Sequence, residues 1–209
     1  MQKNGAIIAN GQPIQTDRLT KILKDVSIII AADAGALHCR QAGISPHYII
    51  GDLDSIAGDL KAGFPHAQII HQPSQYATDM EKALQLAVSL KLSKIKVLSA
   101  LGRRSDHAVA NLLFFREFRD DITLDIYDRY GKFTLLKPGR HLITAQTGQT
   151  ISLIAMQSVN ALTLSGFRYP LDRENFDDFF VGISNVAESD DCIIEFSSGK
   201  LFLYQLEED

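Results

Sequence analysis

The chain has 209 residues, of which 45% are hydrophobic and 22% charged, and its formal net charge is -4 at pH 7. This composition is typical of a globular protein with a substantial core, built as one large domain or two small ones. The acidic balance argues against a surface that binds nucleic acid, so a phosphate-rich ligand would have to be held by local groups or by a metal ion.

The cysteines and the apolar runs narrow the class of protein further. Cys39 and Cys192 lie far apart without CxxC or Cys/His spacing, so neither a zinc site nor a disulfide scaffold is expected. No run approaches the roughly 18 apolar residues of a membrane helix. The N-terminal apolar run is too short for a signal peptide. We therefore expect a cytoplasmic protein that binds neither membranes nor nucleic acid.

The first 128 residues alternate short apolar runs with helical patterns. This alternation predicts a mostly parallel sheet that is covered by helices on both faces. The expected strands are residues 5–10, 27–32, 47–51, 67–72, 94–100 and 122–128. The expected helices are Asp17–Val26, Ala34–Ala42, Ser55–Lys61, Thr78–Leu90 and Asp106–Phe118.

Two of these helices carry recognisable start signals. Thr78 and Glu81 have the spacing of a capping box, and apolar side chains within residues 80–88 recur at helical spacing. Ser105 is a candidate N-cap for the last helix, which places an apolar stripe within residues 109–113 on one side.

After about Tyr130 the pattern changes to short β-rich runs separated by PG, TG and SSG. Such runs predict a small sandwich or barrel. Within them only Leu171–Phe180 has a helical pattern. We expect an α/β plus all-β fold, with an N-terminal α/β domain of mostly parallel sheet over residues 1–130 and a C-terminal β-sandwich domain over residues 131–209.

Aspartates follow several of the predicted strands. Asp52 and Asp54 stand two residues apart directly behind the run YIIG, and in an extended segment this spacing puts both side chains on the same side. Ligands of open α/β sheets bind beyond the carboxyl ends of the strands. We therefore expect a set of aspartates to gather at one edge of the sheet: Asp33, Asp52, Asp54, Asp79 and Asp106.

Such a cluster needs a cation to be stable. Two carboxylates about 5 Å apart repel each other by roughly 3 kcal/mol at an effective dielectric constant of about 20. Oxygen ligands without a neighbouring His or Cys suit Mg²⁺, which also binds substrate phosphates. One aspartate alone is more often a turn or helix-start residue, but several at successive strand ends predict a magnesium site.

The common phosphate-binding motifs are absent, since the sequence contains neither GxxxxGK[ST] nor GxGxxG. The segment GRRSDH, residues 102–107, offers two arginines and a helix N-terminus to an anion. Taken alone, Arg103 and Arg104 fit a solvated loop equally well.

Read in order, six segments resemble motifs of the thiamine pyrophosphokinase family, over nearly the whole chain and with close spacings. The segments are AADAGA (31–36), IIGDLDSI (49–56), ATDMEKAL (77–84), GRRSDHAVANL (102–112), SGFRYPLD (165–172) and GISNV (182–186). The sequence departs from the family's pattern at Ala34 and Arg103, where the family usually has glycine, and it contains no Trp.

The resemblance implies a thiamine diphosphokinase, which transfers pyrophosphate from Mg-ATP to the hydroxyl of thiamine and releases AMP. It also implies a homodimer, in which the α/β domain is catalytic and the β-sandwich domain binds thiamine and dimerises. By matching position, the resemblance makes Asp52, Asp54 and Asp79 catalytic Mg²⁺ ligands. It places Asp33, Thr78 and Arg104 at the nucleotide. It places Asp106 at thiamine, together with Ser184 and Asn185 from the second subunit.

Other interpretations of the residues stay open. A metal-dependent nucleotide-sugar transferase also uses a DxD pair after a strand, whereas an aspartyl-phosphate phosphatase fits poorly with Gly51 and Ser55 around the pair. A non-catalytic binder of thiamine or a nucleotide, or an acidic edge used for partner contacts, would need no reaction. Candidate aromatic partners for the cationic thiazolium ring are Phe167, Tyr169 and Phe180.

Overall fold

The structure is a computed structural model that describes residues 3–54 and 60–207. The chain divides into two compact units, residues 1–129 and residues 130–209. Each unit has a hydrophobic core of its own.

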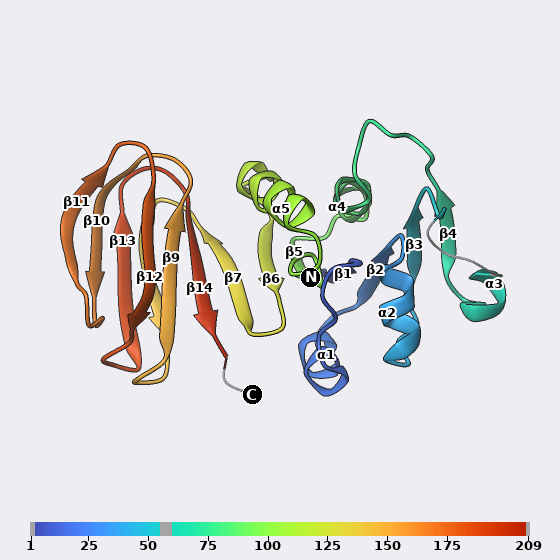
Figure 1. Ribbon diagram of the computed structural model, residues 1–209, viewed down its shortest axis with the longest axis horizontal. Coiled ribbons are helices and arrows are strands. Elements are labelled where there is room, and N and C mark those ends of the chain that lie inside the picture. The colour runs from blue at the N-terminus through green and yellow to red at the C-terminus, as the bar shows by residue number, and fades with distance from the viewer. Residues whose placement is uncertain (1–2, 55–59, 208–209) are drawn as a thin grey trace. The chain divides into compact units, whose positions relative to one another are not determined.

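The first unit is built around a sheet in which neighbouring strands pair in parallel (Figure 1). The chain places three strands in succession on one side of β1 and then crosses to its other side. In spatial order the strands are β6 (Thr123–Tyr127), β5 (Lys94–Leu98), β1 (Asn4–Ile8), β2 (Ile28–Ala32), β3 (Tyr48–Gly51) and β4 (Gln68–His71).

Helices cover both faces of this sheet, as the alternating pattern predicts. Figure 1 shows two helices on one face, α1 (Thr16–Leu23) and α2 (Gly35–Gln41), and two on the other, α4 (Asp79–Ser89) and α5 (Ser105–Glu117). The predicted helix Ser55–Lys61 falls largely outside the described residues, and α3 is Leu60–Gly63.

The capping-box prediction for α4 is confirmed. The Thr78 hydroxyl accepts a hydrogen bond from the Glu81 backbone N–H at 3.2 Å, and the Glu81 carboxylate accepts one from the Thr78 N–H at 2.7 Å. Two of the backbone donors that a helix start leaves unpaired are thereby satisfied. The helix buries an apolar stripe against the sheet, with Met80, Leu84 and Ala87 inside.

The start of α5 differs from its prediction. Ser105 is already the first helical residue, the N-cap position is Arg104, and no side chain caps it. The expected apolar stripe is also only partly covered, because Val109 and Leu113 are 57% and 42% exposed. A strong helical pattern locates a helix but does not specify how much of each face its surroundings cover.

The second unit consists of antiparallel strands in two sheets that bury a shared core. One set is, in spatial order, β12 (Phe180–Val186), β9 (Thr150–Ala155), β14 (Leu201–Leu206) and β7 (Gly131–Leu136). The other is β11 (Leu171–Phe176), β10 (Val159–Ser165), β13 (Asp191–Phe196) and β8 (Gly139–Thr144). The predicted fold class, α/β plus a β-sandwich, is therefore confirmed.

The helical pattern of Leu171–Phe180 was misleading, since these residues form β11 and the start of β12. β11 pairs with β10 and exposes most of its residues, so the cross-strand ladder decides its conformation rather than the burial of one helical face. Among the described residues, no helix is long and apolar enough to cross a membrane.

Candidate active site

A cavity of about 960 Å³ lies in the first unit beyond the carboxyl ends of the strands. Its lining includes residues that directly follow strands: Ala9 follows β1, Asp33 follows β2, Asp52 follows β3 and Ser99 follows β5. The direction in which the chain crosses the sheet reverses between β1 and β5, which is where ligands of open α/β sheets bind. Position and size make this cavity the candidate active site.

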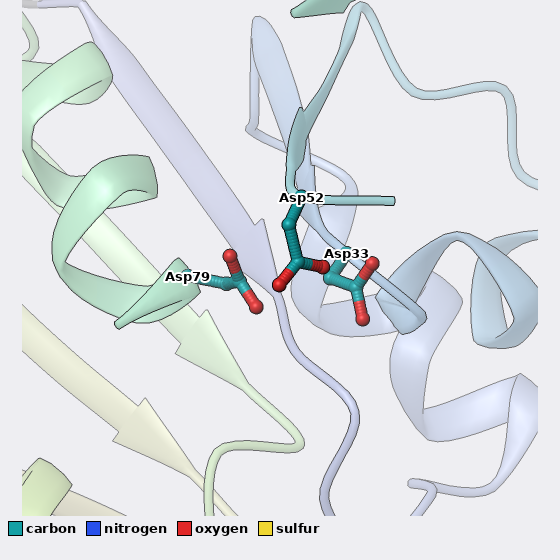
Figure 2. A group of neighbouring side chains, drawn as sticks. All are labelled: Asp33, Asp52 and Asp79. Atoms are coloured by element: carbon teal, nitrogen blue, oxygen red, sulfur yellow. The ribbon is translucent and has the colours of Figure 1, made fainter. Parts of the chain in front are cut away.

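Three carboxylates meet in the cavity. One oxygen from each of Asp33, Asp52 and Asp79 lies within 4.8 Å of the others, and Figure 2 shows the three side chains converging from the ends of two strands and the start of α4. Asp33 is only 7% exposed, and its Oδ1 atom is buried without a hydrogen-bond partner among the described residues. A buried, unpaired acceptor beside two further carboxylates indicates a position for a cation.

The backbone turns sharply where it delivers these side chains. Asp33, Leu53 and Ser99 have φ angles of 43°, 62° and 55°, in the left-handed region that residues with a Cβ seldom adopt. Gly51 allows the strands to come close, because a Cβ there would lie 2.9 Å from the Asp33 Cβ and 3.2 Å from Oδ1 of Asp79. Strained backbone of this kind clusters at functional sites.

Like charges at this separation repel. Two carboxylate oxygens about 5 Å apart cost roughly 3 kcal/mol at an effective dielectric constant of about 20. The donors of the group are all carboxylate oxygens, a set that suits Mg²⁺ better than zinc or copper. The residues present therefore fit a magnesium ion.

Asp54 does not belong to this group, although the sequence pairs it with Asp52. The prediction assumed an extended segment, but β3 ends at Gly51 and the left-handed Leu53 turns the chain, so the two side chains do not continue a strand alternation. Instead the Asp54 N–H donates to Oδ1 of Asp52 at 3.3 Å. Asp33, predicted at the nucleotide, takes the place beside Asp52 and Asp79.

Asp106 and Arg104 lie in the lining of the same cavity and bind each other. Two N–H groups of Arg104 donate to the two Asp106 oxygens at 2.6 and 3.1 Å. The hydrogen bonds to Arg104 lower the pKa of Asp106, so this carboxyl is charged at neutral pH. Both side chains are about two-thirds exposed, so either one can exchange its partner for a ligand.

Ser184 and Asn185 lie in the second unit, on β12. The register between β12 and β9 shifts after Gly182, and Ser184 has a φ of 58°, which marks a bulge. The bulge leaves Ser184 exposed and Asn185 buried, so the two neighbouring side chains predicted at thiamine occupy different environments.

The side chain of the buried Asn185 binds the main chain of Tyr169. Its carboxamide accepts from the Tyr169 N–H at 3.0 Å and donates to the Tyr169 carbonyl at 2.9 Å. Of the three aromatic candidates, Phe167 is buried and Phe180 packs against the core, whereas the ring of Tyr169 is 64% exposed. Tyr169 is thus the one of these three that has an aromatic face for a ligand.

Sequence patterns missed two cavity residues that the structure adds. Lys82 is 2% exposed and donates to Asp79 at 2.9 Å, and Asn10 accepts from Arg103 at 2.9 Å. The i, i+3 spacing of Asp79 and Lys82 is a visible signal for the first contact. Asn10 and Arg103 are far apart in the sequence, and only the fold brings them together.

Protein-family models match both units. A model described as the catalytic domain of thiamin pyrophosphokinase matches residues 19–126, and one described as the vitamin B1 binding domain of the same enzyme matches residues 140–201. The first match alone covers more than half of the chain. The chain belongs to the thiamin pyrophosphokinase family. The matched domains indicate an enzyme, a thiamine diphosphokinase, and they do not favour a nucleotide-sugar transferase or a non-catalytic binder.

Individual relatives agree with this assignment. Thiamine pyrophosphokinase of Bacillus subtilis (strain 168) is 27% identical over 172 residues, which cover 79% of this chain and 80% of the relative. The crystal structure of thiamine pyrophosphokinase from Bacillus subtilis superposes with a TM-score of 0.84 at 25% identity and covers 99% of this chain and 100% of its own. Thiamin pyrophosphokinase from Candida albicans has the same fold, with a TM-score of 0.85 at 23% identity over 99% and 90% of the two chains.

Proposed function

We propose that this chain transfers the pyrophosphoryl group of ATP to the hydroxyl of thiamine, giving thiamine diphosphate and AMP. The observation that carries the proposal is the carboxylate group of Asp33, Asp52 and Asp79, which lies inside the cavity of the unit that matches the catalytic domain. Thiamine and ATP are the proposed partners, and the matched domains on both units support them.

Asp33, Asp52 and Asp79 would hold Mg²⁺, and Asp54, next to them in the chain, stays a predicted further ligand. When bound, the ion neutralises charge on the phosphates of the nucleotide. The start of α4 fixes Asp79, because the capping box of Thr78 and Glu81 orders the turn on which it lies. The Thr78 hydroxyl is used in that cap, so its predicted contact with the nucleotide would come second to its structural role.

Arg104, which also lines the cavity, would add positive charge to it. Its guanidinium presents two parallel donors, which now meet Asp106 and which match a phosphate equally well. Release from Arg104 frees the Asp106 carboxylate to accept from an amine of the thiamine pyrimidine. The same exposed pair can thereby serve both substrates.

For the second unit, we propose that Ser184 and Tyr169 contact thiamine. Ser184 projects from the bulge in β12, and Tyr169 offers an exposed ring to the cationic thiazolium. Asn185 acts through Tyr169, because both polar ends of its carboxamide bind that residue's main chain.

A homodimer is supported by the outer side of β12. Phe179 directly precedes this edge strand, Val181 and Ile183 alternate along it, and the three are 66%, 51% and 66% exposed, in that order. An apolar stripe on an open strand edge is a surface that a second copy of the chain would cover. A cytoplasmic location is supported by Cys39 and Cys192, which are both buried free thiols, as expected in a reducing compartment.

The first experiment is to measure AMP release from ATP and Mg²⁺ with and without thiamine. We expect release that depends on thiamine and that is lost when Asp52 and Asp54 are both changed to Asn. Asp121→Asn serves as the control, because this exposed carboxylate pairs with Arg119 outside the cavity. Turnover of a sugar nucleotide instead, or thiamine binding without AMP, would contradict the proposed reaction.

A further inference from the structure

Lys82 is a buried cation next to the carboxylate group. It lies on the fourth residue of α4, lines the cavity and is 2% exposed, while its Nζ donates to Oδ1 of Asp79 at 2.9 Å. Lysine is seldom buried to this extent unless it is paired. Because its partner Asp79 is one of the three clustered carboxylates, the charge of Lys82 acts directly on that group.

The charges facing one another in this part of the cavity do not cancel. Three carboxylates and the Lys82 ammonium leave a formal charge of -2, which one divalent cation neutralises. Without Lys82 the charge would be -3. The other charged side chains that line the cavity have separate partners: Arg104 and Asp106 bind each other, Glu81 caps α4 and Arg103 binds Asn10.

The same contact fixes how Asp79 is presented. Lys82 holds Oδ1, which also lies near Gly51, and this contact leaves the second oxygen of Asp79 outside the ion pair and available to a cation. Asp79 is itself 32% exposed and would have room to turn toward water without this bond. Lys82 thus acts on both the charge and the orientation of the group.

We infer that Lys82 is a positioning residue that matches the carboxylate site to one divalent cation: it anchors Asp79 and cancels one negative charge. The inference rests on the proposed metal site and adds that Lys82 makes this site prefer a divalent cation over a trivalent one. Nothing in the role requires Lys82 to touch either substrate.

The test compares Mn²⁺ and Tb³⁺ binding to the full chain, by electron spin resonance for Mn²⁺ and by luminescence for Tb³⁺. The variants are Lys82→Met, which keeps the volume but removes the charge, and Lys82→Arg, which keeps the charge. Lys96→Met is the matched control, because Lys96 is also a buried, paired lysine, on β5, and does not line the cavity.

We expect Lys82→Met to shift the ratio of affinities toward Tb³⁺ by about tenfold or more, because a trivalent ion gains more than a divalent one from the uncovered charge. Lys82→Arg and Lys96→Met should keep the wild-type ratio. In turnover, Lys82→Met should lower kcat while the KM for thiamine stays near the wild-type value, since the variant disturbs the metal group and not the proposed thiamine contacts.

An unchanged ratio in Lys82→Met, or an equal shift in Lys96→Met, would overturn the role of Lys82 and leave the metal site standing. If the wild-type chain binds neither ion while it stays folded by circular dichroism, the proposed metal site falls and this inference with it. The two failures are therefore distinguishable.

Discussion

Asp33 combines burial, an unpaired oxygen and a left-handed backbone in one residue. Its φ of 43° is tolerated by Asp and Asn better than by other residues with a Cβ, so Asn can replace it without new backbone strain. A buried carboxylate among like charges is kept at a cost to folding, which is typical of residues retained for function. The residue thus offers a way to separate stability from activity.

We predict that Asp33→Asn stabilises the metal-free protein and abolishes turnover. Removing one of three carboxylates relieves at most roughly 3 kcal/mol of repulsion per pair, and 3 kcal/mol corresponds to a rise of about 6–12 °C in the melting temperature of a chain of this length. Thermal unfolding with and without Mg²⁺ measures both effects, because the variant should also lose any stabilisation by Mg²⁺.

Asp54→Asn is the matched comparison, since the Asp54 side chain is exposed and outside the group. It should leave the melting temperature of the metal-free protein unchanged. If instead Asp33→Asn is no more stable than the wild type and still turns over, Asp33 does not belong to the metal site.

Gly51 is the second residue whose identity the site requires. We predict that Gly51→Ala lowers kcat by at least about tenfold, because the added Cβ would push apart the Asp33 and Asp79 side chains. Gly5→Ala is the control: its Cβ would meet only the flexible Leu92 side chain and the Ile28 carbonyl on the far end of the strand from the cavity. Equal loss of kcat in both variants would show general overpacking and not damage to the site.

These residues also show how far the sequence predicts the site. The order of strands and the aspartates behind them predict which edge of the sheet carries it, because the carboxyl ends of parallel strands meet there. That Asp54 does not join Asp52 depends on one backbone turn at Leu53, and a bulky residue gives no sequence signal for a positive φ. The i, i+3 spacing predicts that Lys82 pairs with Asp79, but it does not predict that Lys82 is buried.

Among the elements, α4 is the one that the sequence describes best. A capping box and an apolar stripe are local signals, so they survive into the fold with little influence from the rest of the chain. The strand β11 is set by its pairing with β10, and there the local helical signal of Leu171–Phe180 was misleading. At α5 the helix begins at Ser105, one residue before the predicted start, so Ser105 is not its N-cap.

The cap of α4 can be tested by itself. Thr78→Ala should lower the free energy of unfolding by about 1 kcal/mol, because the Glu81 N–H loses its acceptor, while Thr78→Ser should retain most of it. Chemical denaturation measures the difference. A Thr78→Ala variant of unchanged stability but with a raised KM for ATP would instead place the Thr78 hydroxyl at the nucleotide.

Because Asn185 on β12 binds the main chain of Tyr169, we predict related effects for substitutions of these two residues. Tyr169→Ala should raise the KM for thiamine and leave stability near the wild-type value, because the ring is exposed. Asn185→Ala should raise the same KM and also cost about 1–3 kcal/mol, since it leaves buried polar groups of Tyr169 unpaired.

Steady-state kinetics at saturating ATP, together with thermal unfolding, separates the two variants. Should Asn185→Ala lose stability and keep the wild-type KM for thiamine, its role is structural only. Should Tyr169→Ala keep that KM, the aromatic contact with thiazolium has to be sought elsewhere.

In the whole molecule, the two matched domains divide the proposed function: the first unit carries the acidic cavity, and the second carries the segments proposed to contact thiamine. The sequence predicts this division because its pattern changes from alternating strands and helices to short β-runs near Tyr130. It does not predict which face of the second unit a partner covers, since exposure on β12 appears only once the strands are placed.

We therefore predict that Ile183→Lys converts a homodimer into monomers, because it places a charge in the middle of the stripe formed by Phe179, Val181 and Ile183. Sedimentation velocity at several protein concentrations measures the change. Leu142→Lys is the control, since Leu142 is 67% exposed on β8 and lies outside the stripe. A dimer that survives Ile183→Lys but not Leu142→Lys would place the interface on the other sheet, and a monomeric wild type would rule out the second copy altogether.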